Sequence, residues 1–311
     1  MNMMWSGKRY HSLNHHLREK FGGKVMKISL DGGFSCPNRD GTISKVGCLF
    51  CSERGSGDFA GTRRLSITEQ FNEVRTVMAK KWSSQKYIAY FQAFTNTYDT
   101  VENLKAKYDE AMNMAGVVGL AIATRPDCLD EDRVRLIAEY AKKSYVWVEL
   151  GLQTSNDTTG RLINRGYDRA VYETAMTLLK QYHIETVTHI IFGLPGETAE
   201  DMLDTVNYVN DQGSSGVKFH LLHLMHHTPL VKLYEAGQLK FLTKEEYIDI
   251  ICRSIGSLDP TVIIHRVTGD APRELLIGPM WSLSKWEILN EIDEELALRN
   301  ICQGSLGGIN Q

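Results

Sequence analysis

The sequence lacks any apolar run approaching the roughly 18 residues that a membrane-spanning helix needs. It shows no signal peptide either, so we expect a cytoplasmic protein with no membrane partner. A strong charge of one sign is also missing, because 38 acidic residues nearly balance 35 basic ones and leave a net charge of −3. This balance excludes a protein that is basic over its whole surface, although a local basic patch could still bind nucleic acid.

Cysteine is scarce, and the single C-x2-C pair has no second C-x2-C or H-x3-H pair to complete it. The chain has six cysteines. Three of them stand isolated in the sequence: Cys128, Cys252 and Cys302. The other three fall within sixteen residues as C-x11-C-x2-C, after an apolar run at residues 25–30: Cys36, Cys48 and Cys51.

Three thiolates on one loop after a strand suit an iron–sulfur cluster, because they bind three irons and leave one iron without a protein ligand. A small chelating cofactor can bind that open iron. The residues alone leave two alternatives. One is structural zinc, although zinc prefers four ligands in two close pairs. The other is a redox-active thiol pair, which leaves Cys36 unexplained.

Strand-like and helical segments alternate along the chain. Six expected strands are rich in apolar, β-branched or aromatic residues: 25–30, 86–94, 117–124, 145–150, 184–192 and 217–224. Apolar residues at helical spacing follow each of them, and capping boxes at Ser66/Glu69 and Thr243/Glu246 mark two helix starts. The alternation predicts an α/β fold with a parallel sheet, curled by right-handed crossovers into an open or partial barrel. A closed eight-stranded barrel is the alternative, and it needs a further strand at residues 261–267.

We expect residues 1–24 to form a basic helical segment, with Leu13, Leu17 and Phe21 at helical spacing. This segment either closes one end of the fold or contacts RNA. Residues 25–259 are expected to form the barrel, and residues 260–311 a C-terminal extension on the same body. No linker or low-complexity stretch divides the chain.

Polar residues gather where the predicted strands end. In a parallel barrel the carboxyl ends of the strands share one rim, and active sites lie there. The cysteine loop follows the first strand, and each later strand ends in a polar segment: residues 92–97, 124–127, 149–153, 189–197 and 220–223. We therefore expect a single site on this rim.

Eight segments carry a family resemblance over nearly the whole chain: residues 31–41, 47–51, 90–97, 124–127, 149–153, 193–197, 265–266 and 268–272. On these segments the chain resembles the radical S-adenosylmethionine (radical SAM) superfamily. Within it, the chain resembles the YtqA/YhcC-type, or MnmL-like, family, which is related to the elongator catalytic subunit and to oxygen-independent coproporphyrinogen oxidase. The resemblance implies a partial (β/α)6 barrel with added ends.

The resemblance also implies two cofactors, a 4Fe–4S cluster and S-adenosylmethionine (SAM). It assigns three irons to Cys36, Cys48 and Cys51, and the fourth iron to the amine and carboxylate of the SAM methionine. The related oxidase cradles this methionine with a glycine-rich strand end. The backbone at that position here belongs to Ala93, Phe94 and Thr95.

Two further residues receive cofactor roles from the resemblance. Gln153 matches a residue near the ribose of SAM. Arg165 matches an arginine that pairs with the methionine carboxylate, and a guanidinium can make that pair bidentate. The alternative for Arg165 is an arginine on a surface loop.

Glu149 is predicted to bind the ribose hydroxyls. His189 and Ala123 stand where the oxidase has an aspartate and a glutamate, so neither supplies the oxidase's acidic contact. Glu149 could supply the acidic contact to the ribose in their place. The alternative is an ion pair with Arg125 or Lys218 inside the barrel, because a carboxylate on a buried strand needs a partner.

The implied reaction begins with one electron from the reduced cluster, which splits SAM into methionine and a 5′-deoxyadenosyl radical that removes a hydrogen atom from the substrate. For this family the implied substrate is tRNA. Its carboxymethylaminomethyl wobble uridine would be trimmed to aminomethyl uridine, which a tRNA methyltransferase then completes. A flavodoxin or ferredoxin is implied as electron donor. The rival hypotheses are a radical SAM enzyme of a small metabolite, such as a porphyrin precursor, and a non-catalytic zinc-bearing RNA-binding protein.

Three further sequence patterns are weaker indications of a binding site. Residues 55–61 are glycine-rich but lack the Lys-Ser/Thr ending of a phosphate loop, so we expect only a flexible connection. His223 with His227 would suggest a second metal only on a helix. Eight basic residues are candidates for phosphate contacts: Lys8, Arg9, Arg18, Lys20, Arg63, Arg64, Lys80 and Lys81.

Overall fold

Seven parallel strands form the main sheet of the computed structural model, which describes residues 4–80 and 84–307. Their order across the sheet is β1-β2-β3-β4-β5-β6-β8. Their bounds are β1 Val25–Leu30, β2 Lys86–Phe91, β3 Val117–Thr124, β4 Tyr145–Gln153, β5 Glu185–Phe192, β6 Gly216–Leu221 and β8 Ile263–Arg266. Parallel neighbours in sequence order require a crossover between each pair, and helices supply it.

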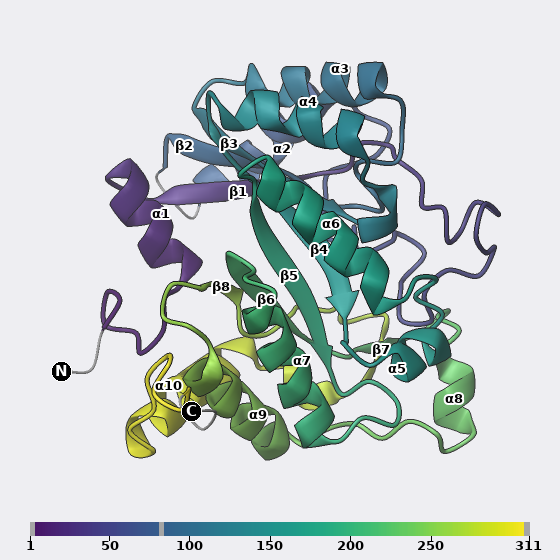
Figure 1. Cartoon of the computed structure of the whole chain (residues 1–311), viewed down its shortest axis with the longest axis vertical. Coiled ribbons are helices and arrows are strands. Elements are labelled where there is room, and N and C mark those ends of the chain that lie inside the picture. The colour runs from purple at the N-terminus through teal and green to yellow at the C-terminus, as the bar shows by residue number, and fades with distance from the viewer. Residues whose placement is uncertain (1–3, 81–83, 308–311) are drawn as a thin grey trace.

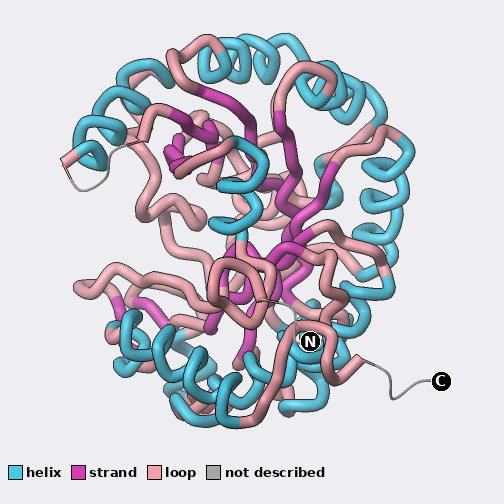
Figure 2. The backbone as a smooth tube through the Cα atoms, turned by 90° about the vertical axis from the view of Figure 1, so that its left-hand side faces the viewer, coloured by secondary structure: helices cyan, strands magenta, loops and turns pink. Residues whose placement is uncertain are grey.

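Most of the helices, but not the first, cover the outer face of this sheet. Their bounds are α1 Leu13–Phe21, α2 Ile67–Ala79, α3 Val101–Met112, α4 Glu131–Ala141, α5 Asp157–Leu162, α6 Arg169–Gln181, α7 Ala199–Asp211, α8 Val231–Glu235, α9 Lys244–Ser257 and α10 Lys285–Leu298, with 3₁₀ turns at Pro126–Cys128 and Met280–Leu283. Figure 1 shows α2, α3 and α4 together at one end of the molecule and α7, α9 and α10 at the other. In Figure 2 the helices form an outer arc around the strands, and the arc is open on one side. The predicted capping boxes at Ser66 and Thr243 are confirmed.

The predicted partial barrel is confirmed, but it has seven strands where six were expected. The additional strand, β8, pairs in parallel with β6. It lies within residues 261–267, which the sequence indicated only as a further strand of the closed-barrel alternative, because a strand of four residues gives little periodic signal. The strand predicted over 217–224 ends at Leu221, and the chain continues into β7 (Leu224–Met225), which pairs antiparallel with the distant β9 (Leu276–Gly278) in a separate two-stranded sheet. The division of the chain at residues 24 and 259 stays a prediction.

The N-terminal helix closes one end of the barrel. Leu13 and Leu17 of α1 pack into an apolar cluster inside the sheet that includes Trp147 and the strand-initial residues Tyr145 and Ile263. This packing places α1 near the amino ends of the strands and confirms the first of its two expected roles. Within residues 4–80 and 84–307, no helix is long and apolar enough to span a bilayer.

Candidate active site

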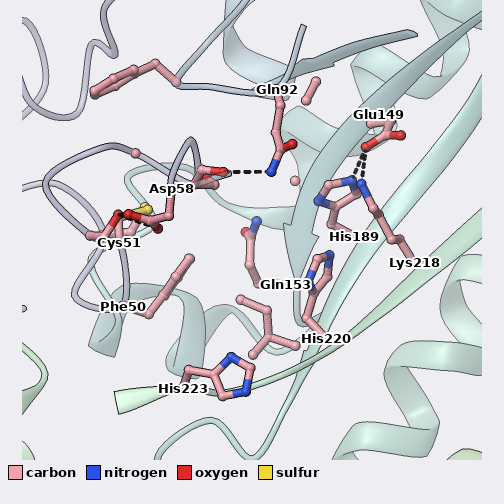
Figure 3. A pocket seen from close by; sticks show the side chains of 18 of the residues that line it. Phe50, Cys51, Asp58, Gln92, Glu149, Gln153, His189, Lys218, His220 and His223 are labelled. Carbon is pink, nitrogen blue, oxygen red and sulfur yellow. Dashed lines mark hydrogen bonds and ion pairs between the residues drawn. The ribbon is translucent and has the colours of Figure 1, made fainter. Parts of the chain in front are cut away.

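A cavity of about 330 Å³ lies at the carboxyl ends of the strands, within the range on the order of 300–1,000 Å³ that is common for small-molecule sites. Every strand of the main sheet contributes a side chain to its wall: Ser29, Tyr90, Ala123, Glu149, His189, Lys218 and Arg266. The expectation that one rim gathers the polar motifs is therefore confirmed. The cysteine loop lies on one side of the cavity and charged strand residues lie on the other, with apolar side chains such as Phe50 and Leu222 also in the wall (Figure 3).

Cys36, Cys48 and Cys51, which we call the cavity cysteines, all line this cavity as free, partly exposed thiols. A hydrogen bond from Cys51, with the charge of Arg125 and the amide of Asn38, lowers the pKa of Cys48 to about 7. The same contact, with burial, holds the pKa of Cys51 well above its ordinary value. One member of the pair is therefore close to the thiolate form that binds metals.

The cavity cysteines fit a cluster better than a single ion. Within the described residues, no group of three or more Cys, His, Asp or Glu side chains is arranged to hold one metal ion. A 4Fe–4S cluster does not need that convergence, because each cysteine binds a different iron.

The cysteine loop is anchored to a segment more than a hundred residues later. The Asn38 side-chain amide donates to the Asn164 carbonyl at 2.7 Å, and the Asn164 amide donates to the Gly47 carbonyl at 2.7 Å. The Leu49 N–H donates to the Ile163 carbonyl at 3.0 Å. Asn164 has a left-handed backbone with φ 54°, which asparagine tolerates better than most residues. The position of the cavity cysteines thus depends on residues 163–165.

Arg165 holds this anchor segment in place and does not line the cavity. Its side chain is completely buried. Its guanidinium donates to the carbonyls of Leu152, Thr154 and Tyr167 at 2.7–2.9 Å and pairs with Asp157 at 2.8 Å. Four of its five N–H groups are therefore occupied by protein. The predicted pairing of Arg165 with the methionine carboxylate is not supported by this position, and Arg165 is not a surface arginine either.

Arg125 is the arginine that faces the cavity beside the cysteines. It makes a bidentate pair with Asp127 at 2.7 and 2.9 Å and donates to the Arg165 carbonyl at 3.0 Å. Its guanidinium lies 4.8 Å from the centre of the Tyr167 ring. The Arg-Pro-Asp motif drew attention to this strand end, but it did not reveal that the arginine acts on the cysteine loop.

The predicted methionine cradle is only partly exposed to the cavity. Phe94 and Thr95 line the cavity, whereas Ala93 is fully buried and does not. The backbone N–H groups of Phe94 and Thr95 already donate to the carbonyls of Gly55 and Ser35. The Thr95 carbonyl also accepts a hydrogen bond from the Tyr98 N–H, so cofactor contacts through this backbone stay a prediction.

The glycine-rich segment 55–61, expected to be a simple connection, contributes to the cavity wall through Gly55, Ser56, Asp58 and Phe59. The Ser56 carbonyl accepts a hydrogen bond from Gln92 at 2.8 Å. A side chain at Gly55 would place its Cβ only 2.6 Å from the Phe94 ring, so glycine is required at that position. Sequence reasoning missed this wall because it treated glycine as a sign of flexibility alone.

Glu149 is the centre of a buried charge network (Figure 3). Its Oε2 accepts hydrogen bonds from Tyr90, His189 and Lys218, each at 2.7 Å. Its Oε1 accepts one from Trp147 at 3.1 Å. The alternative pairing with Lys218 is thus the one that the structure contains, and the pairing with Arg125 is not. Since both carboxylate oxygens have protein partners, a role for Glu149 at the ribose hydroxyls gains no support.

The network sets the charges of its members. Burial alone would raise the pKa of Glu149, but Lys218 and His189 outweigh it and hold that pKa well below its usual range. Burial lowers the pKa of Lys218 to about 7, and burial with the Lys218 charge lowers the pKa of His189 to about 4. Glu149 is therefore ionised and His189 is neutral near pH 7.

Gln153 lies in the middle of the cavity, between the cysteine side and the histidine side (Figure 3). Its backbone is left-handed, with φ 65°. The Tyr167 hydroxyl donates to the Gly151 carbonyl and lies 3.4 Å from the Gln153 Oε1, too long for a strong hydrogen bond. The Gln153 amide is thus largely available to a ligand, and its predicted role near the ribose stays a prediction.

Comparison with known protein families decides between the cluster and its alternatives. The sequence model of the radical SAM superfamily matches residues 36–209, and that of the radical SAM C-terminal domain matches residues 214–297. The chain belongs to the radical SAM superfamily. This superfamily uses a 4Fe–4S cluster and SAM, and the cavity cysteines are chemically suited to such a cluster.

Individual relatives cover most of the chain. It is 50% identical to YtqA of Bacillus subtilis (strain 168), over 96% of this chain and 92% of that protein. It is 39% identical to YhcC of Escherichia coli (strain K12), over 94% and 93%. More distantly, it is 25% identical to the tRNA uridine(34) acetyltransferase of Methanocaldococcus infernus, over 60% of this chain and 35% of that protein. The solved structure of the archaeal M. infernus Elp3 shares the fold, with a TM-score of 0.69 and 17% identity over 90% of this chain and 64% of that one.

Proposed function

We propose that this radical SAM enzyme acts on tRNA and converts carboxymethylaminomethyl uridine at the wobble position to aminomethyl uridine. The observation that carries the enzyme class is the set of three cavity cysteines on one wall of a cavity at the carboxyl ends of the strands. A relative named for its action on uridine 34 of tRNA supports the substrate. A flavodoxin or ferredoxin would supply the electron, and a tRNA methyltransferase would act on the product.

The cavity cysteines would hold the cluster, with SAM on the iron that has no protein ligand. When bound, these groups supply one-electron chemistry that removes a hydrogen atom from an unreactive C–H bond. The chain itself contributes positive charge beside the thiolates through Arg125 and Arg39, which favours a negatively charged cluster. The Glu149 network keeps the far wall polar and fixed, so that a substrate entering the cavity meets an ordered surface.

A wobble uridine suits this geometry. Bases of an anticodon loop are single-stranded and can be splayed into a protein cavity. Phe59 is 56% exposed where it lines the cavity, and an exposed aromatic ring is a stacking surface for such a base. We therefore expect Phe59 to contact the modified uridine or its neighbour.

The basic residues that suit RNA lie on the loops near the cavity rather than on the N-terminal segment. Lys8 pairs with Asp293, and α1 lies at the amino ends of the strands, away from the cavity mouth. Lys81, another predicted candidate, lies outside the described residues. By contrast, the cavity loops carry exposed basic residues for which the described chain shows no ion pair: Lys45, Arg54 and Arg64. Contacts from these residues to phosphates would make binding weaken steeply with salt.

The test is a reaction of the purified enzyme. Reconstituted anaerobically with its cluster, SAM and a reductant, it should convert tRNA bearing carboxymethylaminomethyl uridine and release 5′-deoxyadenosine. Phe59→Ala should lower conversion while leaving the iron content unchanged. Protein with a full cluster that cleaves SAM but leaves this tRNA untouched would refute the proposed substrate and favour a small metabolite.

A further inference from the structure

The cavity wall opposite the cysteines carries a cation without a hydrogen-bond partner. Arg266 lines the cavity with 32% of its side chain exposed. Its guanidinium comes no closer than 3.9 Å to the Asp270 carboxylate, and that carboxylate already accepts two hydrogen bonds from Lys285 at 2.6 and 2.8 Å. The described part of the chain offers Arg266 no hydrogen bond. A guanidinium with five free donors in a cavity is suited to an anion.

A register irregularity brings Arg266 to this wall. Val217 pairs with Ile264, but the next residue, Lys218, pairs with Arg266, so His265 has no partner on β6. Paired residues on neighbouring strands point to the same face of a sheet, so Arg266 joins Lys218 on the inside of the barrel. Lys218 is neutralised by Glu149 at 2.7 Å, which leaves Arg266 as the surplus positive charge of this wall.

Two histidines beside Arg266 have buried ring nitrogens without partners. The Nε2 atoms of His220 and His223 are inaccessible and make no hydrogen bond to the described residues. Both side chains line the cavity, and both approach Gly269, whose Cβ position would lie 3.6 Å from His223 and 3.7 Å from His220. Buried polar atoms normally have a partner, so each ring keeps an unused hydrogen-bonding group. Because both rings line the cavity, turning a ring brings that group to a ligand there.

The two imidazoles are neutral. Burial lowers the pKa of His223 to about 4 although the Asp270 carboxylate opposes it, and Arg266 adds to the lowering. Burial, with Arg266 among the nearby charges, holds the pKa of His220 well below its ordinary value. A neutral imidazole can present an N–H to an anionic oxygen, in the tautomer that the ligand selects. The wall therefore offers one fixed charge and two directional donors.

We propose that Arg266, His220 and His223 form an anion-binding subsite that holds the carboxylate of the substrate side chain. This inference rests on the proposed function, in which the substrate carries that carboxylate and the product has lost it. The carboxylate of SAM is a poor occupant, because its place is at the cluster. The charges that act on Cys48 come from Arg125 and Arg39, whereas Arg266 acts on His220 and its neighbours on the opposite wall.

The test compares two RNAs that differ only in the carboxylate. Anticodon stem–loops carrying carboxymethylaminomethyl or aminomethyl uridine are titrated onto the cluster-loaded protein, and the ratio of their dissociation constants is measured. Phosphate contacts affect both RNAs alike and cancel in the ratio. A charge-assisted contact should make wild type prefer the carboxylated RNA by roughly tenfold to a hundredfold. Arg266→Gln should bring the ratio near one.

Arg273→Gln is the matched control, because it removes an equal charge seven residues later from an exposed side chain that does not line the cavity. It should leave the ratio at the wild-type value. Arg266→Lys should retain part of the preference for the carboxylated RNA, since lysine keeps the positive charge but cannot make the bidentate contact of a guanidinium. Iron content and circular dichroism confirm that each variant is folded. An Arg266→Gln protein that keeps the full preference overturns the subsite.

A second probe separates the subsite from the proposed reaction. N-methylglycine reproduces the amine and carboxylate of the modified base, and it should shift the NMR signals of ¹³C-labelled His220 and His223 in wild type but not in Arg266→Gln. Inorganic phosphate that causes the same shifts with higher affinity would contradict a carboxylate site. If the protein selects the carboxylated probes but never converts the tRNA, the reaction is wrong and the subsite stands. If it converts the tRNA and Arg266→Gln leaves the ratio of the two dissociation constants unchanged, the subsite is wrong.

Discussion

Replacing Arg165 by alanine should destabilise the protein and release its cluster. Arg165 is fully buried, and its guanidinium bonds three backbone carbonyls and one carboxylate. Alanine would leave the buried carbonyls of Leu152 and Thr154 without their donor. Asp157 would be less affected, because it is 31% exposed and keeps the hydrogen bond from the Arg169 N–H. The segment that anchors the cysteine loop would lose its main support.

The magnitude follows from these contacts. Each buried acceptor left without a partner costs about 1–3 kcal/mol, and breaking a buried ion pair costs about 3–5 kcal/mol. Because Asp157 keeps other contacts, we expect a loss of about 3–5 kcal/mol for the whole substitution. With an unfolding entropy of about 2.1 cal/mol/K per residue, 311 residues give about 0.65 kcal/mol/K. The melting temperature should therefore fall by about 5–8 °C.

The assay combines thermal melting with iron analysis of anaerobically purified protein. Arg161→Ala is the control, because Arg161 is only four residues earlier in the chain, is 63% exposed and pairs at 3.1 Å with a carboxylate that is also exposed. An exposed pair is worth about 1 kcal/mol or less, so the control should melt within about 2 °C of wild type. If Arg165→Ala keeps its melting temperature and its iron but binds SAM weakly, Arg165 is a cofactor ligand and our assignment is wrong.

Three further predictions concern the rest of the cavity. Alanine at any one cavity cysteine should abolish the iron content and visible absorption of the cluster, whereas Cys252→Ala should retain both; a full cluster without one cavity cysteine would exclude the assignment. Lys218→Met should lower the free energy of unfolding in urea by about 3–5 kcal/mol, because it leaves the buried Glu149 carboxylate without its cation. Adding Glu149→Gln should restore part of that loss. If the two substitutions instead lower the stability additively, Lys218 and Glu149 do not act as a pair. His223 binds a proton more readily in the unfolded chain than in the folded protein, so its protonation should lower the free energy of unfolding by about 1.2 kcal/mol between pH 7 and pH 5.5. Stability is thus lost as the pH falls below about 6.5, and His223→Gln should reduce this loss; equal pH dependence in both proteins would contradict it.

Much of the fold could be predicted from the sequence, because buried parallel strands read as apolar runs and the helices between them carry capping signals. The runs at 25–30 and 117–124 match β1 and β3 residue for residue. β8 was uncertain because a four-residue strand at the sheet edge leaves almost no periodic signal. The sequence also could not show that β6 ends at Leu221, since the apolar residues continue into β7.

The candidate site could be predicted from the sequence where a pattern of one residue type has a single common function. Clustered cysteines on a loop signal metal binding wherever the fold places them. Arg165 shows the opposite case, because a motif gives its position but not that protein atoms occupy its guanidinium. Arg266 enters the cavity only through a register irregularity, which no sequence pattern reveals. The sequence left Glu149 with two possible partners, Arg125 and Lys218, and only the folded sheet decides for Lys218, which is 69 residues away.

The wobble nucleoside of tRNA from a strain that lacks this gene tests the central claim most directly. Mass spectrometry of digested tRNA from the deletion strain should show carboxymethylaminomethyl uridine accumulating while the aminomethyl and methylaminomethyl forms disappear. Wild-type protein should restore the normal profile, and a variant lacking Cys48 should not. An unchanged profile in a deletion strain with no redundant enzyme would contradict the proposed function.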